Sequence, residues 1–525
     1  MKFFNTAGPM QRDIHYALPP VNRLNRNELL SLIDERKYFI LHAPRQTGKT
    51  SCMLALVEEL NRSGKYRAVY ANIEAAQAQR NQVERAMRVI INEIARQASL
   101  ILNDKFPLSR TKEILNQFGA DDALTALLTE WSAAESIPLV LVFDEIDALI
   151  GDTLISVLRQ LRAGYAKRPA AFPQTVILCG VRDVRDYRIH TSNQEIITGG
   201  SAFNIKAESL RLGNFSRDEI RTLYEQHTAE TGQVFEDAIY PLVWELTAGQ
   251  PWLVNALAYE ICFRKGRGSD RSQPVTVELV QEAKEKLIDR RDTHLDQLTD
   301  KLREDRVRRV IGPILSGLTS PENIPNDDIS YVYDLGLITT EGGQIAIANR
   351  IYQEVIPRDL TYSTQVTISH QTAWYIGADG RLEMNRLLTA FQQFFREHSE
   401  HWVERFDYKE AGPQLLLQAF LQRIVNGGGR IEREYGLGRQ RTDLLVIWNH
   451  PQGIQRVVLE LKLRTSKLET VIEAGLQQTW EYLDRCAGDE GHLVIFDRDP
   501  GKPWEEKIFH RAETVHGRTL EIWGM

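Results

Sequence analysis

The stretch APRQTGKTS, residues 43–51, decides the fold of the N-terminal part of this chain. The apolar run YFILHA (38–43) before it predicts a strand, and residues 50–60 after it carry apolar side chains at helical spacing. A loop that ends in Gly-Lys-Thr between a strand and a helix is typical of phosphate binding. Backbone N–H groups of the loop and the helix N-terminus supply positive potential there. The sequence therefore predicts a phosphate-binding loop that opens an α/β domain.

Each residue of this loop has an expected part in binding ATP. Lys49 is expected to reach the β- and γ-phosphates, and the Thr50 hydroxyl to ligate Mg²⁺. Ala43 stands where the pattern usually has its first glycine. Alanine is small, so this replacement is tolerable if φ at position 43 is negative. The alternative is a chance Gly-Lys-Thr in a turn, which the flanking strand and helix disfavour. The residues expected to contact ATP here are Arg45, Gln46, Thr47, Gly48, Lys49, Thr50 and Ser51.

Two further strand ends are expected to complete the nucleotide site. The apolar run LVLVF (139–143) ends in Asp144-Glu145. Asp144 is expected to hold Mg²⁺, and Glu145 to polarise the attacking water. Taken alone, such a carboxylate pair is mostly structural. Arg182 follows the next strand, TVILCG (175–180), and either senses a γ-phosphate or is a solvated basic residue.

The chain divides into five expected segments. Residues 1–215 alternate strand-like and helix-like stretches, which predicts a parallel α/β sheet. Residues 216–295 are helical, and residues 296–358 form a small helical domain that ends in a hairpin around Glu341-Gly342-Gly343. Residues 359–410 are interpreted as a bridging segment, and residues 411–525 as a separate α/β domain.

Composition restricts the partners. Across 525 residues the hydrophobic content is 42%, the charged content is 26% and the net charge is −7, so no global field draws nucleic acid and a basic surface must be local. The four cysteines show no metal-binding spacing, which favours a reducing cytoplasm. Neither a signal peptide nor a membrane span is expected.

Several motifs together resemble the bacterial and archaeal STAND-type, AAA-like ATPases over roughly residues 1–358. These motifs are Gly-Lys-Thr, FDEID (143–147), GVRDV (180–184), GQPW (249–252) and IANRIYQEVIP (347–357). The resemblance implies an ATPase core (1–215), a helical lid (216–295) and a winged-helix domain (296–358). It also implies nucleotide-controlled switching, frequent oligomerisation and a position close to the nucleotide for Pro251. A winged helix of this kind usually packs against the core, so its basic residues (Lys301, Arg303, Arg306, Arg308, Arg309) are interpreted as a solvated face.

A pair of charges inside an apolar strand marks the C-terminal domain. In VVLELKL (457–463), Glu460 and Lys462 emerge on one face, where they need a partner. The strand RTDLLVIW (441–448) precedes it across the turn NHPQG (449–453), so Asp443 and Glu460 are expected to meet. Two carboxylates suit Mg²⁺ or Mn²⁺, and the Leu461 carbonyl is a candidate third ligand. Lys462 is expected to position or deprotonate a water beside the metal.

The pattern Asp443…Glu460-Leu461-Lys462 on a hairpin, with a helix on either side, resembles the PD-(D/E)XK nuclease core over about residues 411–500. Thr442 replaces the leading proline. In the second helix, Gln478 and Tyr482 resemble the Q-x-x-x-Y element of helicase-associated nucleases, where these residues contribute to the active site. Further candidates are Glu410 as a carboxylate and Arg433, Arg439 and Arg441 as phosphate contacts. An ion pair on an edge strand is the alternative for Glu460 and Lys462.

The sequence thus predicts a P-loop NTPase parallel sheet with a helical lid and a winged helix, joined to a C-terminal restriction-endonuclease-like α/β domain. The expected function is an ATP-hydrolysing switch that controls a metal-dependent nuclease acting on DNA rather than RNA. Its expected cofactors are ATP and Mg²⁺, with Mn²⁺ as an option at the nuclease site, and its expected setting is defence against phage or mobile DNA, by analogy of fold. Two alternatives stay open: a signalling or scaffold ATPase whose C-terminal domain binds without cutting, and a DNA translocase or repair factor.

Overall fold

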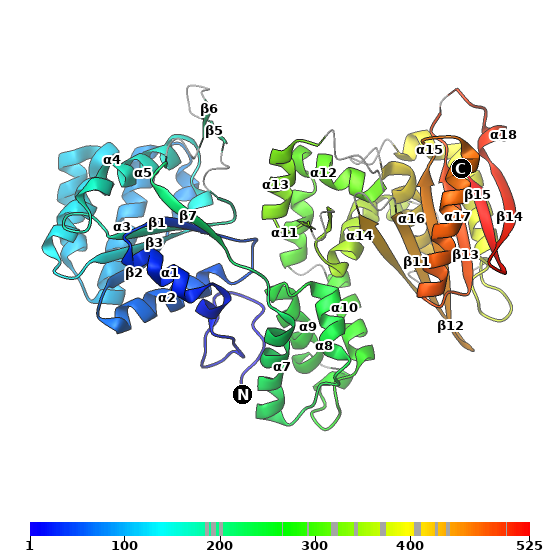
Figure 1. The fold of residues 1–525 in the computed structure, drawn as a ribbon, viewed down its shortest axis with the longest axis horizontal. Helices are drawn as coiled ribbons and strands as arrows, with labels where there is room; N and C mark the ends of the chain where they lie inside the picture. Colours follow the sequence, from blue (N-terminus) through cyan, green and yellow to red (C-terminus); the bar gives the residue numbers. More distant parts are fainter. Residues whose placement is uncertain are drawn as a thin grey trace. The chain divides into compact units, whose positions relative to one another are not determined.

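The computed structural model describes residues 1–183, 188–190, 196–198, 203–264, 266–290, 293–316, 324–340, 345–367, 374–403, 411–425, 429–436, 441–499 and 501–525. They form two compact units (Figure 1). The first unit comprises Met1–Trp244, Ala248–Lys284 and Asp334–Gly336, and the second comprises the remaining described residues up to Met525. The five segments expected from the sequence are finer than these two units, and their boundaries stay predictions.

A five-stranded sheet forms the centre of the first unit, in the order β2-β3-β4-β1-β7. All its pairings are parallel, as the alternation of strands and helices predicted. Four of the strands were visible in the sequence as apolar runs, whereas β7 is polar and half-exposed at the edge of the sheet. The strands are β1 (Tyr38–His42), β2 (Arg67–Asn72), β3 (Leu139–Asp144), β4 (Thr175–Gly180) and β7 (Lys206–Arg211).

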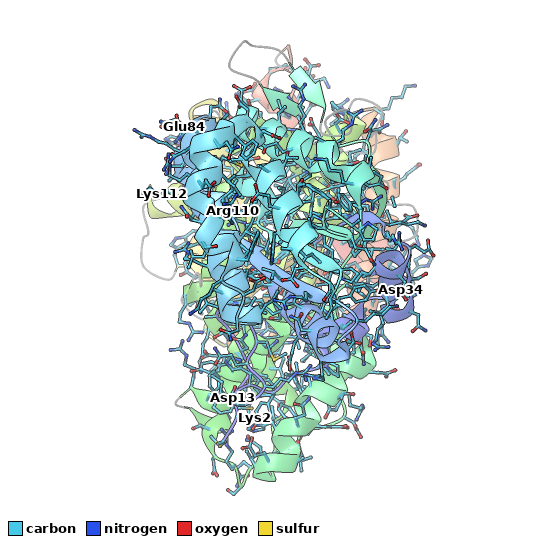
Figure 2. The ribbon with its side chains drawn as sticks, turned by 90° about the vertical axis from the view of Figure 1, so that its left-hand side faces the viewer. Lys2, Asp13, Asp34, Glu84, Arg110 and Lys112 are labelled. Atoms are coloured by element: carbon cyan, nitrogen blue, oxygen red, sulfur yellow. The ribbon has the colours of Figure 1, made fainter. Side chains whose placement is uncertain are left out.

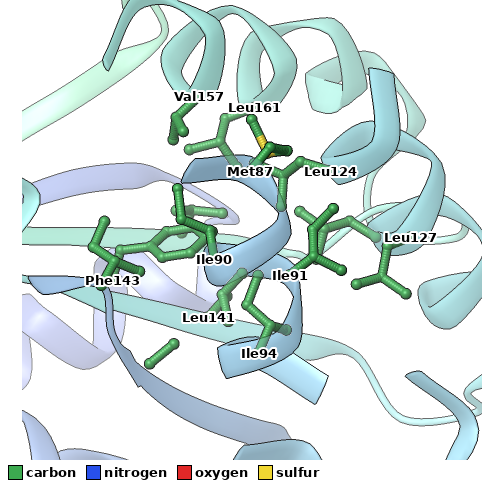
Figure 3. Close-up of a cluster of buried hydrophobic side chains, with 14 of the residues drawn as sticks. Met87, Ile90, Ile91, Ile94, Leu124, Leu127, Leu141, Phe143, Val157 and Leu161 are labelled. Atoms are coloured by element: carbon green, nitrogen blue, oxygen red, sulfur yellow. The ribbon is translucent and has the colours of Figure 1, made fainter. Parts of the chain in front are cut away.

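Helices cover both faces of this sheet. On one face, α1 (Arg26–Asp34) and α2 (Lys49–Ser63) pack against residues such as Phe39 and Val142. On the other face lie α3 (Val83–Leu102), α4 (Phe106–Ala134) and α5 (Gly151–Gly164), which enclose Leu141 and Phe143 (Figure 3). A short hairpin of β5 (Arg188–His190) and β6 (Ile196–Thr198) follows β4. Because the sheet is buried on both faces, function is confined to the ends of its strands.

The expected helical lid consists of α7 (Arg217–Thr231), α8 (Ile239–Thr247), α9 (Pro251–Phe263) and α10 (Val277–Arg290). The first lid helix, α7, starts with a capping box: Ser216 Oγ accepts from Glu219 N, and Glu219 Oε2 accepts from Ser216 N. The extended N-terminal segment pairs with these helices. Lys2 N donates to Glu230 of α7, and Figure 2 shows Lys2 beside the lid.

The second unit begins with the expected winged-helix region. Its helices are α11 (Thr293–Lys301), α12 (Asp305–Ser316), α13 (Asn326–Asp334, whose last residue belongs to the first unit) and α14 (Arg350–Thr367), with the short antiparallel pair β8 (Ile338–Thr339) and β9 (Ala346–Ile347). This pair confirms the predicted hairpin strands, whereas its predicted turn, 341–343, lies outside the described residues.

A six-stranded mixed sheet completes the second unit, in the order β10-β11-β12-β13-β15-β14. Its β10 to β12 are antiparallel, β12, β13 and β15 are parallel, and β14 pairs antiparallel with β15. Thus β12 is an interior strand, and the edge strand assumed in the alternative for Glu460 and Lys462 was wrong. The strands are β10 (Gly429–Gly436), β11 (Arg441–His450), β12 (Gly453–Leu463), β13 (Glu490–Phe496), β14 (Phe509–Val515) and β15 (Arg518–Gly524).

The helices of this sheet include one that the sequence interpretation missed. The expected helices are α16 (Gly412–Val425) and α17 (Leu468–Arg485), and α18 (Trp504–Lys507) is a single turn. The expected bridging segment contains α15 (Met384–Val403), whose Gln392 donates to the carbonyls of Phe509 and Gly524. Helix α15 is therefore bonded to the C-terminal sheet. Among the described residues, no helix has the length and hydropathy needed to cross a membrane.

Candidate functional site

The loop of residues 43–48 joins β1 to α2, and Lys49 is the first residue of that helix. The Lys49 side chain is buried, and Nζ donates to the carbonyl oxygens of Ala43 (2.9 Å) and Pro44 (3.0 Å). The Thr47 hydroxyl donates to Pro44 O at 2.7 Å. These bonds curl the loop around the Lys49 ammonium group, which is the charge a phosphate-binding loop requires.

Backbone conformation explains the residue types in the loop. Gly48 has φ +91° and Gln46 has φ +57°, so the chain turns twice through the left-handed region before α2 begins. A Cβ at Gly48 would also lie 3.0 Å from Nη1 of Arg23, and only glycine avoids both penalties. Ala43 is buried and is not among the positive-φ residues, so the expected condition for replacing the first glycine is met.

The Asp144 carboxylate lies at the end of β3 and is fully buried. Oδ2 accepts from the Thr50 hydroxyl (2.8 Å) and from the Tyr70 hydroxyl (2.7 Å), and Oδ1 accepts from Glu145 N (2.9 Å). The sequence predicted that Thr50 and Asp144 act together, and the structure brings them into direct contact. A hydroxyl and a carboxylate are hard oxygen donors, so this pair fits Mg²⁺.

Glu145 occupies the left-handed region, with φ 59° and ψ 42°. This conformation is uncommon outside glycine and asparagine and marks a position that the surrounding structure enforces. Burial raises the pKa of the Glu145 carboxyl above its ordinary value, and the carboxylates of Asp147 and Asp144 raise it further, whereas Lys49 lowers it. A carboxylate with a raised pKa is a better proton acceptor, as the expected role requires.

Arg182 follows the carboxyl end of β4, which lies beside the carboxyl ends of the parallel strands β1 and β3. Its buried Nε lies 3.4 Å from Asp334 Oδ2. The backbone N–H of the neighbouring Val181 donates to Asp147 Oδ1 at 3.2 Å. Arg182 is therefore a buried, ion-paired residue, and the solvated basic residue considered as the alternative was wrong. Its role toward a γ-phosphate stays a prediction.

Gly249-Gln250-Pro251, part of the GQPW motif, forms the break between α8 and α9. Pro251 is the first residue of α9, where its missing N–H costs nothing. Gln250 caps the helix by accepting from Leu253 N at 2.6 Å. Gly249 has φ +70°, and its carbonyl accepts from Phe215 N at 2.8 Å. The position of Pro251 relative to a nucleotide stays a prediction.

Replacing Gly249 with alanine is expected to destabilise the first unit by about 3 kcal/mol, because the strained φ adds to a severe clash. The new Cβ would lie 2.0 Å from the backbone oxygen of Phe215. Gly232→Ala is the matched control: Gly232 has φ +78° in the same lid and open space around a Cβ, so a loss of about 1 kcal/mol is expected. Urea unfolding of both variants measures the difference, and equal losses would contradict the expected clash.

Arg23 is a residue of the loop environment that the sequence interpretation missed. Its Nη1 donates to Thr47 O and its Nη2 to Gly213 O, and its guanidinium lies 4.8 Å from the centroid of the Phe215 ring. Burial lowers the pKa of Arg23 to about 10. The N-terminal segment makes a second contact with α2, where Met10 N donates to Ser51 Oγ at 2.9 Å. The Ser51 hydroxyl, which was expected to contact ATP, therefore contacts the protein's own backbone.

The second candidate site lies at the end of the β11–β12 hairpin. Asp443 is paired directly with Glu460, and this is the last pair of the ladder, so Leu461 lies one residue beyond it. The predicted hairpin is confirmed by this register, whereas the Asp443 side chain lies outside the described residues. Glu460 is fully buried, and Lys462 Nζ lies 2.6 Å from its Oε1. Glu460 and Lys462 therefore form an ion pair on an interior strand, with Glu460 fully buried and Lys462 partly buried.

Helix α17 covers the face of the sheet on which Glu460 lies. Val458, which shares that face, packs with Tyr482 and other apolar residues of α17. Tyr482 is buried in this core, and Arg485 lies 4.8 Å from its ring centroid. Gln478, one turn earlier, is partly exposed, and its Oε1 is buried without a hydrogen-bond partner among the described residues. The expected roles of Gln478 and Tyr482 in catalysis stay predictions.

The arginines expected to meet phosphate have different outcomes. Arg433 is buried, and it donates to Gln418 Oε1 (2.6 Å) and to the carbonyl of Leu315 (2.8 Å). It is a structural residue, and its expected role as a phosphate contact was wrong, because β10 directs it into the interior. Glu410, Arg439 and the side chain of Arg441 lie outside the described residues.

The basic residues near α12 form ion pairs. Each of them lies within 4 Å of a carboxylate: Lys301 with Glu304, Arg303 with Asp300, Arg308 with Asp305, and Arg306 and Arg309 with Asp328. This supports the interpretation of a solvated face. Among the side chains that the structure describes, no group of three or more His, Cys, Asp or Glu residues could hold a metal ion.

A phosphate-binding loop before α2, a buried carboxylate at the end of β3 and a parallel sheet define an ATPase of the P-loop type. The chain belongs to the AAA-like domain family, whose model matches residues 33–357. No curated protein matches the sequence.

Solved structures with a similar fold include a Walker-type ATPase of Pyrococcus abyssi, with 15% identity and a TM-score of 0.44, covering 67% of this chain and 99% of that one. They also include Cdc6p of Pyrobaculum aerophilum, with 14% identity and a TM-score of 0.36. This match covers 77% of this chain and 94% of Cdc6p. A variant of RuvB from Thermotoga maritima has 14% identity and a TM-score of 0.33. This match covers 63% of this chain and 93% of RuvB. These likenesses concern the fold alone.

Proposed function

We propose that this AAA-like ATPase is a switch whose ATP binding and hydrolysis control a metal-dependent nuclease in the C-terminal domain. The proposed substrate is DNA, in preference to RNA. The observation that carries the nuclease half is the pairing of Asp443 with Glu460 at the end of the hairpin, beside Lys462. Without that register, the two carboxylates could not share one cation.

In the ATPase half, Lys49 would bind the phosphates, with the loop N–H groups around them. Thr50 and Asp144, already 2.8 Å apart, would hold Mg²⁺, which when bound neutralises charge on the phosphates. Glu145 is attached to the same strand end and would orient and deprotonate the attacking water. Its raised pKa suits that task.

In the nuclease half, the chemistry of the residues supports a hard cation. Glu460 contributes a buried carboxylate, position 443 lies opposite it, and Leu461 adds a carbonyl group just beyond the end of the β11–β12 pairing. A divalent ion held there would supply an activated water and charge stabilisation for phosphodiester hydrolysis. Lys462, beside Glu460, would hold that water or the phosphate.

Glu145→Gln tests the ATPase half. The amide keeps the shape of the side chain but cannot accept the proton, so turnover is expected to fall about a hundredfold or more while ATP binding is retained. The Glu145 pKa is raised above the ordinary value of 4.5. As the pH is lowered, wild-type turnover should therefore begin to fall at a higher pH than it would with an ordinary glutamate. Turnover by phosphate release and binding by fluorescent ATP measure the two effects. Glu59→Gln, which removes a surface contact with Arg26, is the control and should leave both unchanged; a Glu145→Gln variant as active as this control would contradict the assignment.

A second function is supported by one specific observation. Lys462 Nζ lies 2.6 Å from Glu460, so the buried carboxylate has a countercharge without any metal. The domain could then bind nucleic acid or a protein partner without cutting, as in a signalling or scaffold ATPase. Supercoiled plasmid incubated with Mn²⁺, with and without ATP, separates the two functions: nicking supports the nuclease, and gel-shifted but intact plasmid supports the binding domain.

A further inference from the structure

One buried tyrosine on a neighbouring strand contacts the carboxylate of the nucleotide site. Tyr70 lies on β2, which pairs in parallel with β3, so that Asn72 faces Asp144 and Tyr70 faces Val142. Its ring is buried, and its hydroxyl donates to Asp144 Oδ2 at 2.7 Å. The Thr50 hydroxyl donates to the same oxygen at 2.8 Å, while Oδ1 accepts from Glu145 N.

The donors from Glu145, Thr50 and Tyr70 have different parts, and the Cys179 thiol on β4 also bonds to the Asp144 carboxylate. A buried carboxylate needs hydrogen bonds to stay charged, and charge-assisted bonds are the strongest available. The bond from Glu145 N is local backbone, so it does not connect Asp144 to another element of the fold. Thr50 has one proton, which it donates to Asp144, and its lone pairs remain for a cation. Tyr70 is then the side chain that fixes the carboxylate from β2, independently of the phosphate-binding loop.

Tyr70 is also suited to remain a donor. A phenol hydroxyl has one proton, and Tyr70 donates that proton to Asp144 Oδ2. By contrast, Tyr66, just before the same strand, donates to Asp34 of α1 at the surface, where Figure 2 labels Asp34. Tyr66 thus makes a hydroxyl–carboxylate bond of the same type as Tyr70, but away from the nucleotide site.

We propose that Tyr70 is a positioning residue that holds Asp144 toward Thr50 and thereby sets the affinity of the site for the Mg²⁺ that accompanies ATP. This inference rests on the proposed roles of Thr50 and Asp144 in the ATPase half. Tyr70 acts through Asp144 and touches neither the phosphates nor the attacking water. Its removal should therefore alter the metal dependence of nucleotide binding and leave metal-free binding intact.

The test compares Tyr70→Phe with the matched control Tyr66→Phe in the full chain. Affinity for a fluorescent ATP analogue is measured in EDTA and in saturating Mg²⁺, and the ratio of the two dissociation constants is the gain due to the metal. Tyr70→Phe is expected to reduce this gain about tenfold, the effect of one hydrogen bond to a charged group, without changing affinity in EDTA. Tyr66→Phe should leave both values unchanged.

The outcomes distinguish a failure of the proposed metal site from a failure of the role of Tyr70. A wild-type protein whose ATP affinity does not respond to Mg²⁺ would overturn the proposed metal site itself. A normal gain in wild type that Tyr70→Phe preserves would overturn the role of Tyr70 alone. In an Asp144→Asn background, Tyr70→Phe should have no additional effect on the gain, and an undiminished tenfold effect there would also overturn it.

A second variant keeps the proposal testable if Tyr70→Phe does not fold, as judged by circular dichroism. Site-specific 3-fluorotyrosine at position 70 keeps the ring and the hydroxyl but makes the phenol a stronger hydrogen-bond donor. The gain in ATP affinity due to Mg²⁺ is then expected to rise above the wild-type value. A gain that stays the same or falls would overturn the proposal.

Discussion

Replacing Lys49 with alanine is expected to lower ATP turnover by about a thousandfold, the scale of losing one charged group that stabilises the transition state. Lys49 is the buried cation at the start of α2, and its ammonium group is held by the Ala43 and Pro44 carbonyls at the mouth of the loop. Alanine keeps the helix and removes the charge. ATP affinity should fall with turnover, because both need the phosphates bound. Phosphate release and fluorescent ATP binding measure the two losses.

The control for Lys49→Ala is Lys65→Ala. Lys65 pairs with a carboxylate at the surface, where its Nζ lies 2.5 Å from Asp34 Oδ1. Such a surface pair contributes about 0–1 kcal/mol to stability and nothing to the nucleotide site. Lys65→Ala should therefore turn over ATP like wild type. If the nuclease half of the proposal is correct, any ATP dependence of plasmid nicking disappears in Lys49→Ala alone. Turnover in Lys49→Ala equal to that of the control would refute the phosphate-binding role.

Local patterns predicted most of the nucleotide site. The loop 43–51 combines a strand, a turn and a helix start within one short stretch, so its structure depends on nearby residues. The same holds for the hairpin, where a turn and two apolar strands fix the register of Asp443 against Glu460. Charges that break an apolar run, such as Glu460, are visible because burying them is costly. These features need no knowledge of strand order.

The features that sequence reasoning missed depend on strand order and on long-range packing. The Tyr70 hydroxyl reaches Asp144 only because β2 lies beside β3, and nothing in YRAVYAN (66–72) indicates that neighbour. Arg23 reaches Thr47 and Gly213 because a segment before the sheet returns to the loop. An arginine has no sequence mark for such a role. The apolar residues of β7 (KAESLR) are Ala207 and Leu210, three positions apart, so the alternation typical of a strand is absent there.

One misinterpretation concerns how a buried charge is recognised. Arg433 stands in a polar-looking stretch and was expected to face phosphate, yet it is buried against Gln418 and a backbone carbonyl. Its neighbour Glu432 instead pairs with Arg350 and Arg430. In an antiparallel strand, adjacent residues face opposite sides. The sequence shows this alternation, but it does not show which face of the sheet is covered. At this position the side chains on both faces, Glu432 and Arg433, are buried.

Glu460→Gln is expected to reduce plasmid nicking by about a thousandfold while ATP turnover stays at the wild-type level, because one ligand of a catalytic metal is lost. Glutamine has nearly the same volume as glutamate, so the interior strand β12 keeps its packing. The change removes the Glu460 charge that lies 2.6 Å from Lys462 Nζ, which costs stability. Thermal unfolding must therefore accompany the nicking assay, to show that the variant is folded at the assay temperature.

A carboxylate at the other end of the same sheet provides the control. Glu490 starts β13, pairs in register with Val457 and accepts from Gln455 Nε2 at 2.8 Å, three residues along the strand from the position opposite Glu460. Glu490→Gln should lose less stability than Glu460→Gln, because the Glu490 side chain is 40% exposed, and it should keep full nicking activity. Equal nicking by both variants would mean that the cleavage comes from elsewhere, and would remove the hairpin from the mechanism. Intact plasmid with wild type under every nucleotide condition would favour the binding function instead, in which the Lys462–Glu460 pair is a buried structural element that needs no metal.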